Sequence, residues 1–269
     1  MHIFFRPVIA GLFLSAWMQH AGAAPTLSGF SHDDALAYSQ AVIGTKPTNI
    51  QLQADDGSAL TLADYRGKPL VISLIFTSCH HICPSTTQHL AEVVGKARAV
   101  LGEDSFNVLT VGFDTANDTP ERMAQFRRET GVADSHWQFA AGSAQHMQSL
   151  VDQLGFIYAP SSRGFDHLIQ ASVLDADGAV YRQVYGITFP TPTLVEPLKQ
   201  LVFGEPREQS TLDYLQNRIR LFCTVYDPAT DSYHIDVSVF IGTFVGIVVS
   251  IVFGIVLVRE WRRSMKAGR

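Results

Sequence analysis

Two cysteines separated by three residues are the side chains of this chain whose type and spacing can do chemistry together. Cys79 and Cys83 follow residues 71–76, an apolar, β-rich run typical of a strand buried on both faces. Pro84 comes next, and a helical pattern then continues to about Leu101. This order places the thiols at the carboxyl end of a central strand, where open α/β sheets hold their sites. In the first turn of the helix, the i, i+4 spacing would put both cysteines on one face, where the dipole favours thiolate.

Two thiolates so placed support three interpretations. The simplest is a structural disulfide. The second is a redox-active dithiol, although redox motifs usually have two residues between the cysteines rather than three. The third is a metal site, for which soft thiolates suit Cu(I) best, with Zn²⁺ as the rival. The residues alone leave all three open. The third cysteine, Cys223, is distant in the sequence, and we interpret it as structural or unpaired.

The segments around the cysteines alternate between strand and helix patterns. Residues 49–62 have the pattern of a β-hairpin around an Asp-Gly turn, and residues 106–113 form a second buried strand. Thr119 is a good N-cap for a helix that has Pro120 at its first position. The remaining expected elements are a strand at 136–140, a helix after 143, a polar loop at 161–167, a hairpin within 171–185 and a helix at 193–203. The order predicts a three-layer α/β fold, of the thioredoxin type given the early cysteine pair.

Both ends of the chain have the composition of membrane-targeting segments. Residues 1–24 combine one cation, an apolar core too short to span a bilayer and a small-x-small cleavage site, which is the pattern of a signal peptide. Residues 237–258 are uncharged, mostly apolar and long enough to span. Five Lys or Arg residues follow in 259–269, so the positive-inside rule predicts a cytoplasmic C-terminus. We therefore expect a single-pass inner-membrane protein with its functional domain on the periplasmic side.

The expected organisation of the chain has five parts. They are a signal peptide at 1–24, a thioredoxin-like domain at 25–204, a connector and hairpin at 205–236, a transmembrane helix at 237–258 and a basic tail at 259–269.

The charge of the exported part is more negative than the total suggests. The whole chain has a net charge of −5, but residues 25–258 carry 14 Lys or Arg and 24 Asp or Glu, a net charge of −10. An acidic domain of this kind argues against binding to nucleic acid, whose phosphates attract basic surfaces. A basic partner surface would suit it better.

Several motifs together resemble one family. Residues 77–84, Thr-Ser-Cys-His-His-Ile-Cys-Pro, resemble the copper-site motif of the Sco/SenC proteins, copper chaperones for cytochrome c oxidase assembly. Residues 114–121 are similar to the acidic loop after that family's next strand, and Asp166-His167 resembles the loop that supplies its histidine ligand. Gly57 and residues 62–69 match the hairpin that precedes the family's central strand. The resemblance covers about residues 45–203.

The resemblance implies a fold, a metal and a function. The fold would be thioredoxin-like, and the ligands would be Cys79, Cys83 and His167, a set that binds Cu(I) and can also hold Cu(II). The protein would deliver copper to the dinuclear copper site of cytochrome c oxidase subunit II or a related copper enzyme, and another copper carrier is a second candidate partner. The alternative is a thiol–disulfide oxidoreductase that keeps the partner's cysteines reduced. In that case Cys79 and Cys83 would be catalytic, and His167 would not be required.

The sequence also departs from the family pattern. His80 and His81 replace the usual Pro-Asp between the cysteines, and we interpret both as solvated loop residues. The family's N-terminal membrane helix is replaced by a C-terminal one, which changes the expected geometry toward a partner but not the site. Asp114 and Asp118 are interpreted as loop and cap residues.

Overall fold

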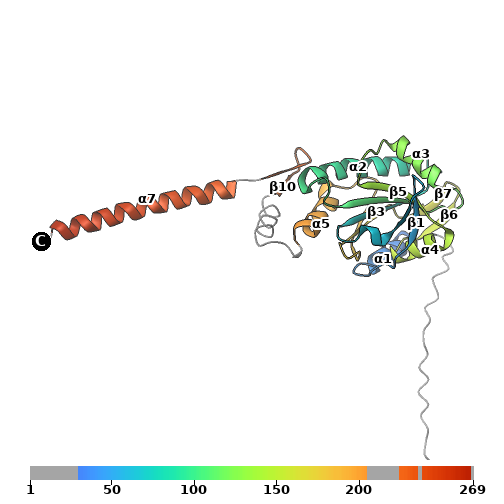
Figure 1. The fold of residues 1–269 in the computed structure, drawn as a ribbon, viewed down its shortest axis with the longest axis horizontal. Coiled ribbons are helices and arrows are strands. Elements are labelled where there is room, and N and C mark those ends of the chain that lie inside the picture. The colour runs from blue at the N-terminus through green and yellow to red at the C-terminus, as the bar shows by residue number, and fades with distance from the viewer. Residues whose placement is uncertain (1–29, 205–223, 236–237, 268–269) are drawn as a thin grey trace, which may run out of the picture.

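The computed structural model describes residues 30–204, 224–235 and 238–267. The predicted signal peptide and residues 205–223 of the predicted connector, which include Cys223, lie outside the described residues. Residues 30–204 form one α/β domain (Figure 1). A hairpin within 224–235 and a long apolar helix within 238–267 follow it.

A seven-stranded mixed sheet lies at the centre of the domain, in the order β2-β1-β5-β4-β3-β8-β9. β3, β4 and β5 are parallel, whereas β1, β8 and β9 each run antiparallel to the neighbour on their inner side. The strands are β1 (Gln51–Ala54), β2 (Ala59–Thr61), β3 (Leu70–Ile75), β4 (Asn107–Gly112), β5 (Trp137–Ala141), β8 (Gln170–Leu174) and β9 (Val180–Tyr185). All six residues of β3 are buried, as its continuous apolar run predicts.

Helices cover both faces of this sheet. They are α1 (His32–Ala41), the short 3₁₀ helix η1 (Leu62–Tyr65), α2 (Ile82–Leu101), α3 (Pro120–Thr130), α4 (Ala144–Gln153) and α5 (Thr191–Phe203). α2 and α3 lie on one face and α1 and α4 on the other (Figure 1), and α5 packs against α2. In α2, the buried residues recur every three or four positions, the period of a helix packed along a sheet. The layers confirm the predicted α/β, thioredoxin-like fold.

The pairing of β3 with β8 decides what lies beside the cysteines. The two strands are antiparallel, with Leu70 opposite Leu174 and Ser73 opposite Ala171. Because the partner of an antiparallel strand runs backwards, the residues just before β8 lie at the end of the sheet where β3 ends. The turn after β3 and the segment before β8 are therefore neighbours, although some 90 residues separate them in the sequence.

One predicted loop is a hairpin. Residues 161–167 were expected to be irregular, but β6 (Tyr158–Ser161) and β7 (Gly164–His167) pair in antiparallel register, with Tyr158 opposite His167. The run is polar and short, so its sequence lacks the apolar alternation by which half-buried strands are recognised. The hairpin is stabilised instead by tertiary contacts of its aromatic side chains with the main domain.

A second hairpin docks on the domain just before the last helix. β10 (Thr224–Asp227) and β11 (Ser232–Ile235) pair as the sequence predicted, and β11 contacts α2. Asp231, in the turn at φ 45°, forms an ion pair with Lys96 of α2, and the Tyr233 hydroxyl donates to Glu196 of α5 over 3.0 Å. Polar contacts to two helices thus attach this hairpin to the domain.

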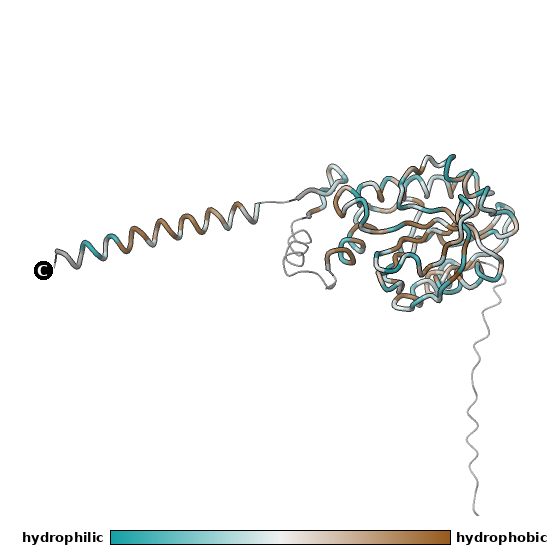
Figure 2. The backbone as a smooth tube through the Cα atoms, in the orientation of Figure 1, coloured by the Kyte–Doolittle hydropathy of each residue, from teal (hydrophilic) through white to brown (hydrophobic). Residues whose placement is uncertain are grey.

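The last helix has the composition of a membrane span. α7 (Ser238–Ala267) contains a stretch, Ile241–Arg263, that is long and apolar enough to cross a bilayer, with a mean hydropathy of 2.8 over its most apolar window. It projects away from the domain, and Figure 2 shows hydrophobic residues along most of its length. Its large apolar side chains are exposed in the protein alone, which is the pattern of a helix whose solvent is lipid.

Candidate metal centre

The two cysteines lie on either side of the start of α2. Cys79 is in the turn between β3 and α2, where its N–H donates to the carbonyl of Phe76 over 3.1 Å. Cys83 is the second residue of the helix and is buried. The expectation that both could lie in the first helical turn is wrong, because the helix begins at Ile82. They are nevertheless adjacent, since the Cys83 N–H donates to the Cys79 sulfur over 3.3 Å, and both thiols are free.

The contact between the cysteines makes them chemically unequal. A hydrogen bond from the Cys83 thiol, supported by the N–H groups of Cys83, His81 and Ile82, lowers the pKa of Cys79 to about 5 against partial burial. The same hydrogen bond, together with burial, raises the pKa of Cys83 well above its ordinary value. At neutral pH the half-buried Cys79 is therefore a thiolate, and the buried Cys83 keeps its proton.

His167, the third predicted ligand, is the last residue of β7. Its imidazole packs among aromatic rings, with ring centroids 5.2 Å from Phe156, 5.6 Å from Phe113 and 6.0 Å from Phe76. Phe76 directly follows β3, so the residue that leads into the Cys79 turn also forms one wall around the histidine. These contacts hold the ring in place without using either of its nitrogens.

The hydrogen bonding of His167 leaves one nitrogen suited to a metal. Nδ1 lies 2.7 Å from the carbonyl oxygen of Leu168. A carbonyl can only accept, so Nδ1 carries the proton and Nε2 keeps its lone pair. Burial lowers the pKa of His167, which keeps the imidazole neutral near pH 7. A backbone carbonyl that fixes the tautomer is a typical support for a metal-binding histidine.

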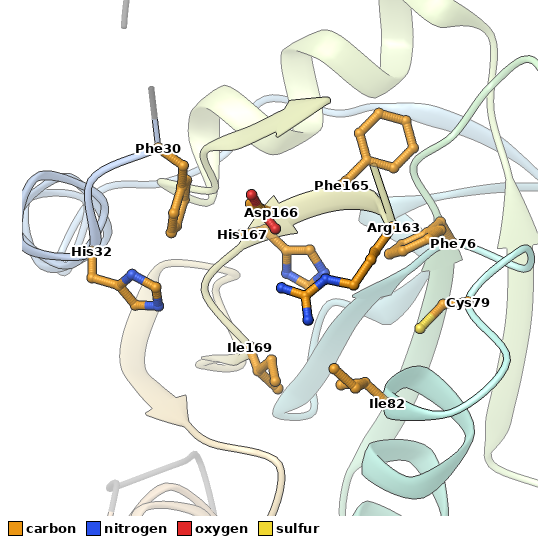
Figure 3. A pocket seen from close by; sticks show the side chains of 10 residues that line it. All are labelled: Phe30, His32, Phe76, Cys79, Ile82, Arg163, Phe165, Asp166, His167 and Ile169. Carbon is orange, nitrogen blue, oxygen red and sulfur yellow. The ribbon is translucent and has the colours of Figure 1, made fainter. Parts of the chain in front are cut away.

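Cys79 and His167 face a common cavity of about 470 Å³ (Figure 3). Its walls also include the side chains of Phe30, His32, Phe76, Ile82, Arg163, Phe165, Asp166 and Ile169. Phe30, His32 and Arg163 have no signal in the sequence, because no motif connects the start of α1 or the β6–β7 turn with the cysteines. Only the packing of the two hairpin strands and α1 around the end of β3 brings these residues together.

The donor atoms fit a soft metal, although they do not close around a common point. Among the described residues, no group of three or more His, Cys, Asp or Glu side chains is near enough to hold one ion. Cys79 and His167 share a cavity, and Cys83 contacts Cys79 from inside the helix. A thiolate, a second thiol and a neutral imidazole are the ligands that Cu(I) prefers, with Zn²⁺ also possible on chemistry alone.

A buried carboxylate holds the turn that carries Cys79. Asp118 is 3% exposed; its Oδ1 accepts hydrogen bonds from the Thr77 N–H at 2.8 Å and the Thr77 hydroxyl at 2.6 Å, and its Oδ2 accepts from the Asp114 N–H at 2.8 Å. Burial raises the pKa of this carboxyl and the three hydrogen bonds oppose that shift. We interpreted Asp118 from sequence as a loop or cap residue, and its link to Thr77 could not be inferred from residues 41 positions apart.

The backbone of the β4 strand leaves room for Asp118. A Cβ atom at Gly112 would lie 2.5 Å from the Asp118 Cβ, so only glycine allows the carboxylate to pack there.

The two histidines between the cysteines, His80 and His81, are exposed, in agreement with their expected solvation.

Comparison with known protein families identifies the chain. The family model described as SCO1/SenC matches residues 45–202, and the chain therefore belongs to the SCO1/SenC family. The SCO1 protein homolog of Bacillus subtilis (strain 168) is 25% identical over 144 residues, which are 50% of this chain and 71% of that protein. The human mitochondrial protein SCO2 homolog is 27% identical over 190 residues, 67% of this chain and 69% of that protein.

Solved structures have the same fold. A protein from Aquifex aeolicus VF5, described as an electron transfer protein, has 27% sequence identity and a TM-score of 0.56, covering 62% of this chain and 97% of its own. Arabidopsis thaliana ScoI with copper bound has 18% identity and a TM-score of 0.51, covering 58% and 99%. BsSco, a member of the Sco family of cytochrome c oxidase assembly proteins in which a disulfide switch was identified, has 20% identity and a TM-score of 0.52, covering 58% and 93%. At 18% and 20% identity, the Arabidopsis and BsSco structures show that the fold is shared.

The unequal thiols predict a pH profile. Because only the thiolate attacks, alkylation of Cys79 by iodoacetamide should have a midpoint near pH 5 and fall about tenfold per pH unit below it. Cys83→Ala removes the thiol donor and should move the midpoint toward the ordinary value of about 8.5. Mass spectrometry of the modified peptide assigns the reaction to Cys79. A wild-type midpoint near 8.5 would contradict the geometry.

The Thr77–Asp118 contact predicts a matched pair of variants. Thr77→Val keeps the shape of the side chain but removes the hydroxyl that donates to the buried carboxylate, so urea unfolding should show a loss of about 1.5–3 kcal/mol. Thr77→Ser keeps the donor and serves as the control. Because the turn carries Cys79, Thr77→Val should also raise the alkylation midpoint. Equal unfolding midpoints for the two variants would rule out this role for Asp118.

Proposed function

We propose that this protein binds copper through Cys79, Cys83 and His167 and passes it to a copper enzyme. The observation that carries the proposal is the shared cavity, in which the Cys79 thiolate and the His167 imidazole are exposed to one space. Copper is here the cargo of the protein. Its relative of the same fold, ScoI from Arabidopsis thaliana, is described with copper bound, and membership of the SCO1/SenC family supports the same cargo.

Each ligand has a distinct part in this proposal. Cys79 is already ionised and provides the first soft ligand, and Cys83 joins after losing its proton to solvent or to a base. His167 offers Nε2 from a ring fixed by the Leu168 carbonyl. Three ligands leave a coordination position open, which allows a partner's ligand to enter before the metal leaves. Cys79 lies in a turn before α2, so it can move toward His167 without breaking the hydrogen bonds of the helix.

The proposed recipient is the dinuclear copper site of cytochrome c oxidase subunit II, or a related copper enzyme, with another copper carrier as a possible donor. What supports it is the family: BsSco is described as a member of the Sco family of cytochrome c oxidase assembly proteins. No nucleic-acid partner is proposed, because the net charge of −10 between residues 25 and 258 opposes binding to phosphates.

The proposed setting is the periplasmic side of the inner membrane. The apolar helix Ile241–Arg263 supports anchoring, and the cations after residue 258 support a cytoplasmic C-terminus. In this arrangement residues 1–24 are a signal peptide, 25–204 the copper-binding domain, 205–236 a connector with a hairpin, 237–258 the membrane span and 259–269 the basic tail.

A different observation supports a second function. Cys79 is a thiolate in contact with a protonated Cys83, the arrangement of an attacking and a resolving cysteine. The same site could therefore reduce a disulfide: Cys79 attacks one sulfur, the partner's other sulfur leaves as thiolate, and Cys83 then displaces the partner by closing the Cys79–Cys83 disulfide. This reaction makes no use of the His167 lone pair.

The ligand set is tested by metal affinity. Cys79→Ser or Cys83→Ser in the detergent-solubilised full chain, purified without oxygen, should weaken Cu(I) binding by about 100-fold or more, which exceeds the typical effect of losing a hydrogen bond to a ligand. His167→Ala should weaken it less and alter the Cu(II) absorption spectrum. His80→Ala and His81→Ala are the controls and should bind like the wild type. If either control matters as much as His167, the ligand set is wrong.

The two proposed functions differ in whether they need the imidazole of His167. In cells that lack the native protein, a His167→Ala variant should leave cytochrome c oxidase activity low, and added copper should partly restore it, because delivery needs the imidazole. Cys79→Ser is the control that disables both functions. Full oxidase activity in the His167→Ala strain would favour the reductase.

The membrane arrangement is tested by fusions. A reporter that is active only in the cytoplasm should be active when fused after Arg269, and a reporter that is active only after export should be active when fused near Pro206. Cytoplasmic activity at Pro206 would contradict the topology.

A further inference from the structure

An arginine without a partner lies in the wall of the cavity. Arg163 is in the turn between β6 and β7, and its side chain lines the same space as Cys79 and His167 (Figure 3). Within residues 30–204, 224–235 and 238–267, its guanidinium makes no hydrogen bond or ion pair. Its backbone N–H donates to the Ser161 hydroxyl over 3.3 Å, which shapes the turn.

The turn that carries Arg163 is fixed against the rest of the site. Gly164 follows it with φ at 106°, a conformation that favours glycine, and a Cβ there would lie 2.7 Å from the Phe76 ring. The turn therefore packs directly on the aromatic residue that precedes the Cys79 turn. Arg163 is held on the wall by this backbone contact rather than by a bond to its own charged group.

The remainder of the cavity wall is mostly apolar. Its other side chains include Phe30, Phe76, Ile82, Phe165 and Ile169, and Ile82 is 45% exposed beside the reactive sulfur. Arg163 itself is exposed, so its guanidinium is hydrated and an ion pair formed there contributes at most about 1 kcal/mol. The cavity wall also contains one acid, Asp166, which directly precedes His167 in β7.

Charge decides what kind of group this cavity admits. The exported part of the chain carries a net charge of −10, and Asp166 adds an acidic side chain to the cavity wall itself. An acidic group approaching the sulfur would be repelled unless a local cation compensates. Arg163 is that cation, and the planar guanidinium matches a carboxylate through two parallel hydrogen bonds.

We propose that this cavity is the docking site for a partner segment that carries a carboxylate side chain next to its own reactive or metal-binding sulfur. Arg163 pairs with the carboxylate while the sulfur approaches Cys79, and the apolar wall covers the neighbouring part of the segment. The inference rests on the proposed function, since it names the kind of partner segment that the same site accepts. The partner as a whole can still carry a positive charge, which would attract it to the acidic surface outside the cavity.

The test compares two small disulfides that differ in one group. The probes are the symmetrical disulfide dimers of the peptides acetyl-Glu-Cys-Leu-amide and acetyl-Gln-Cys-Leu-amide. Cys79 attacks one probe sulfur, the probe S–S bond breaks as the Cys79–S bond forms, and one peptide thiolate leaves; Cys83 then releases the second peptide by closing the Cys79–Cys83 disulfide. Released thiol is followed by stopped flow at pH 7 and low salt with the detergent-solubilised full chain, and the Cys79→Ser variant subtracts reaction at Cys223.

The wild type should react about three- to fivefold faster with the Glu probe than with the Gln probe, and 0.5 M salt should reduce this ratio. Arg163→Gln should bring the ratio to one or below, because the acidic domain, with Asp166 in the cavity wall, then repels the carboxylate. Arg163→Lys keeps the charge but not the bidentate geometry and should keep part of the preference. The matched control is Arg128→Gln, at an exposed arginine of α3 that does not line the cavity, and it should keep the full preference.

Two results would overturn the proposal: a wild-type ratio near or below one, or a preference that survives in Arg163→Gln. If Arg163→Gln slows both probes equally, the preference survives, and Arg163 then acts on the reactivity of Cys79 and not on the probe. Circular dichroism of Arg163→Gln checks that the variant is folded, and the ratio is internal to each variant, so a change in overall reactivity cancels. The Cu(I) affinity of the wild type is measured separately, and its absence would remove the proposed function while leaving the ratio intact.

Discussion

The antiparallel register between β3 and β8 is the constraint on which the rest of this structure depends. It sets Ser73 opposite Ala171, and the chain leaving β3 therefore meets the chain about to enter β8. Cys79 follows the first of these strands by four residues, and His167 precedes the second by three. A shift of one residue in this register would turn the buried side chains of β8 to the other face and separate the cysteine from the histidine. Sheet pairing, rather than the local motif, brings the two together.

The site itself depends on buried polar groups that must form hydrogen bonds with one another. Asp118 is buried, and its negative charge is tolerated because Thr77 and Asp114 donate three hydrogen bonds to it. The cysteines divide one proton between them, so that the more exposed sulfur carries the charge and the more buried sulfur stays neutral. His167 remains neutral for the same reason, since its ring is surrounded by aromatic side chains. The hydrogen bond between the two thiols, together with the burial of Cys83 and His167, therefore decides which groups of the site are charged.

The helix α2 connects the end of the domain that holds the cysteines with the end that lies next to the hairpin before α7. Cys83 is in its first turn, and Lys96, thirteen residues later, pairs with Asp231 of the hairpin that leads to α7. At 1.5 Å per residue these positions are about 20 Å apart along the helix. The β6–β7 hairpin and α7 accordingly lie at opposite ends of the protein (Figure 1). With α7 in a bilayer, the cavity would open away from the lipid, toward a partner that presents its sulfur above the membrane surface.

The sequence by itself determined the elements whose signals are local. The buried strand before Cys79, the helix that ends at Leu101, the Thr119 cap with Pro120 and the hairpin at 224–235 all follow from patterns within about twenty residues. The candidate ligands Cys79, Cys83 and His167 also came from the sequence, through the resemblance of their motifs to one family. Their assignment as ligands remains a proposal, whereas the fold is confirmed.

Only the tertiary structure decided which distant residues surround the reactive sulfur. The contact of Asp118 with Thr77, the packing of Gly164 on Phe76 and the position of Arg163 in the cavity wall depend on strand order and on the volume of neighbouring side chains. The start of α2 at Ile82, which leaves Cys79 outside the helix, was likewise seen only in the structure. None of these has a periodic or compositional signal, because each is a contact between segments that become neighbours only when the sheet has formed.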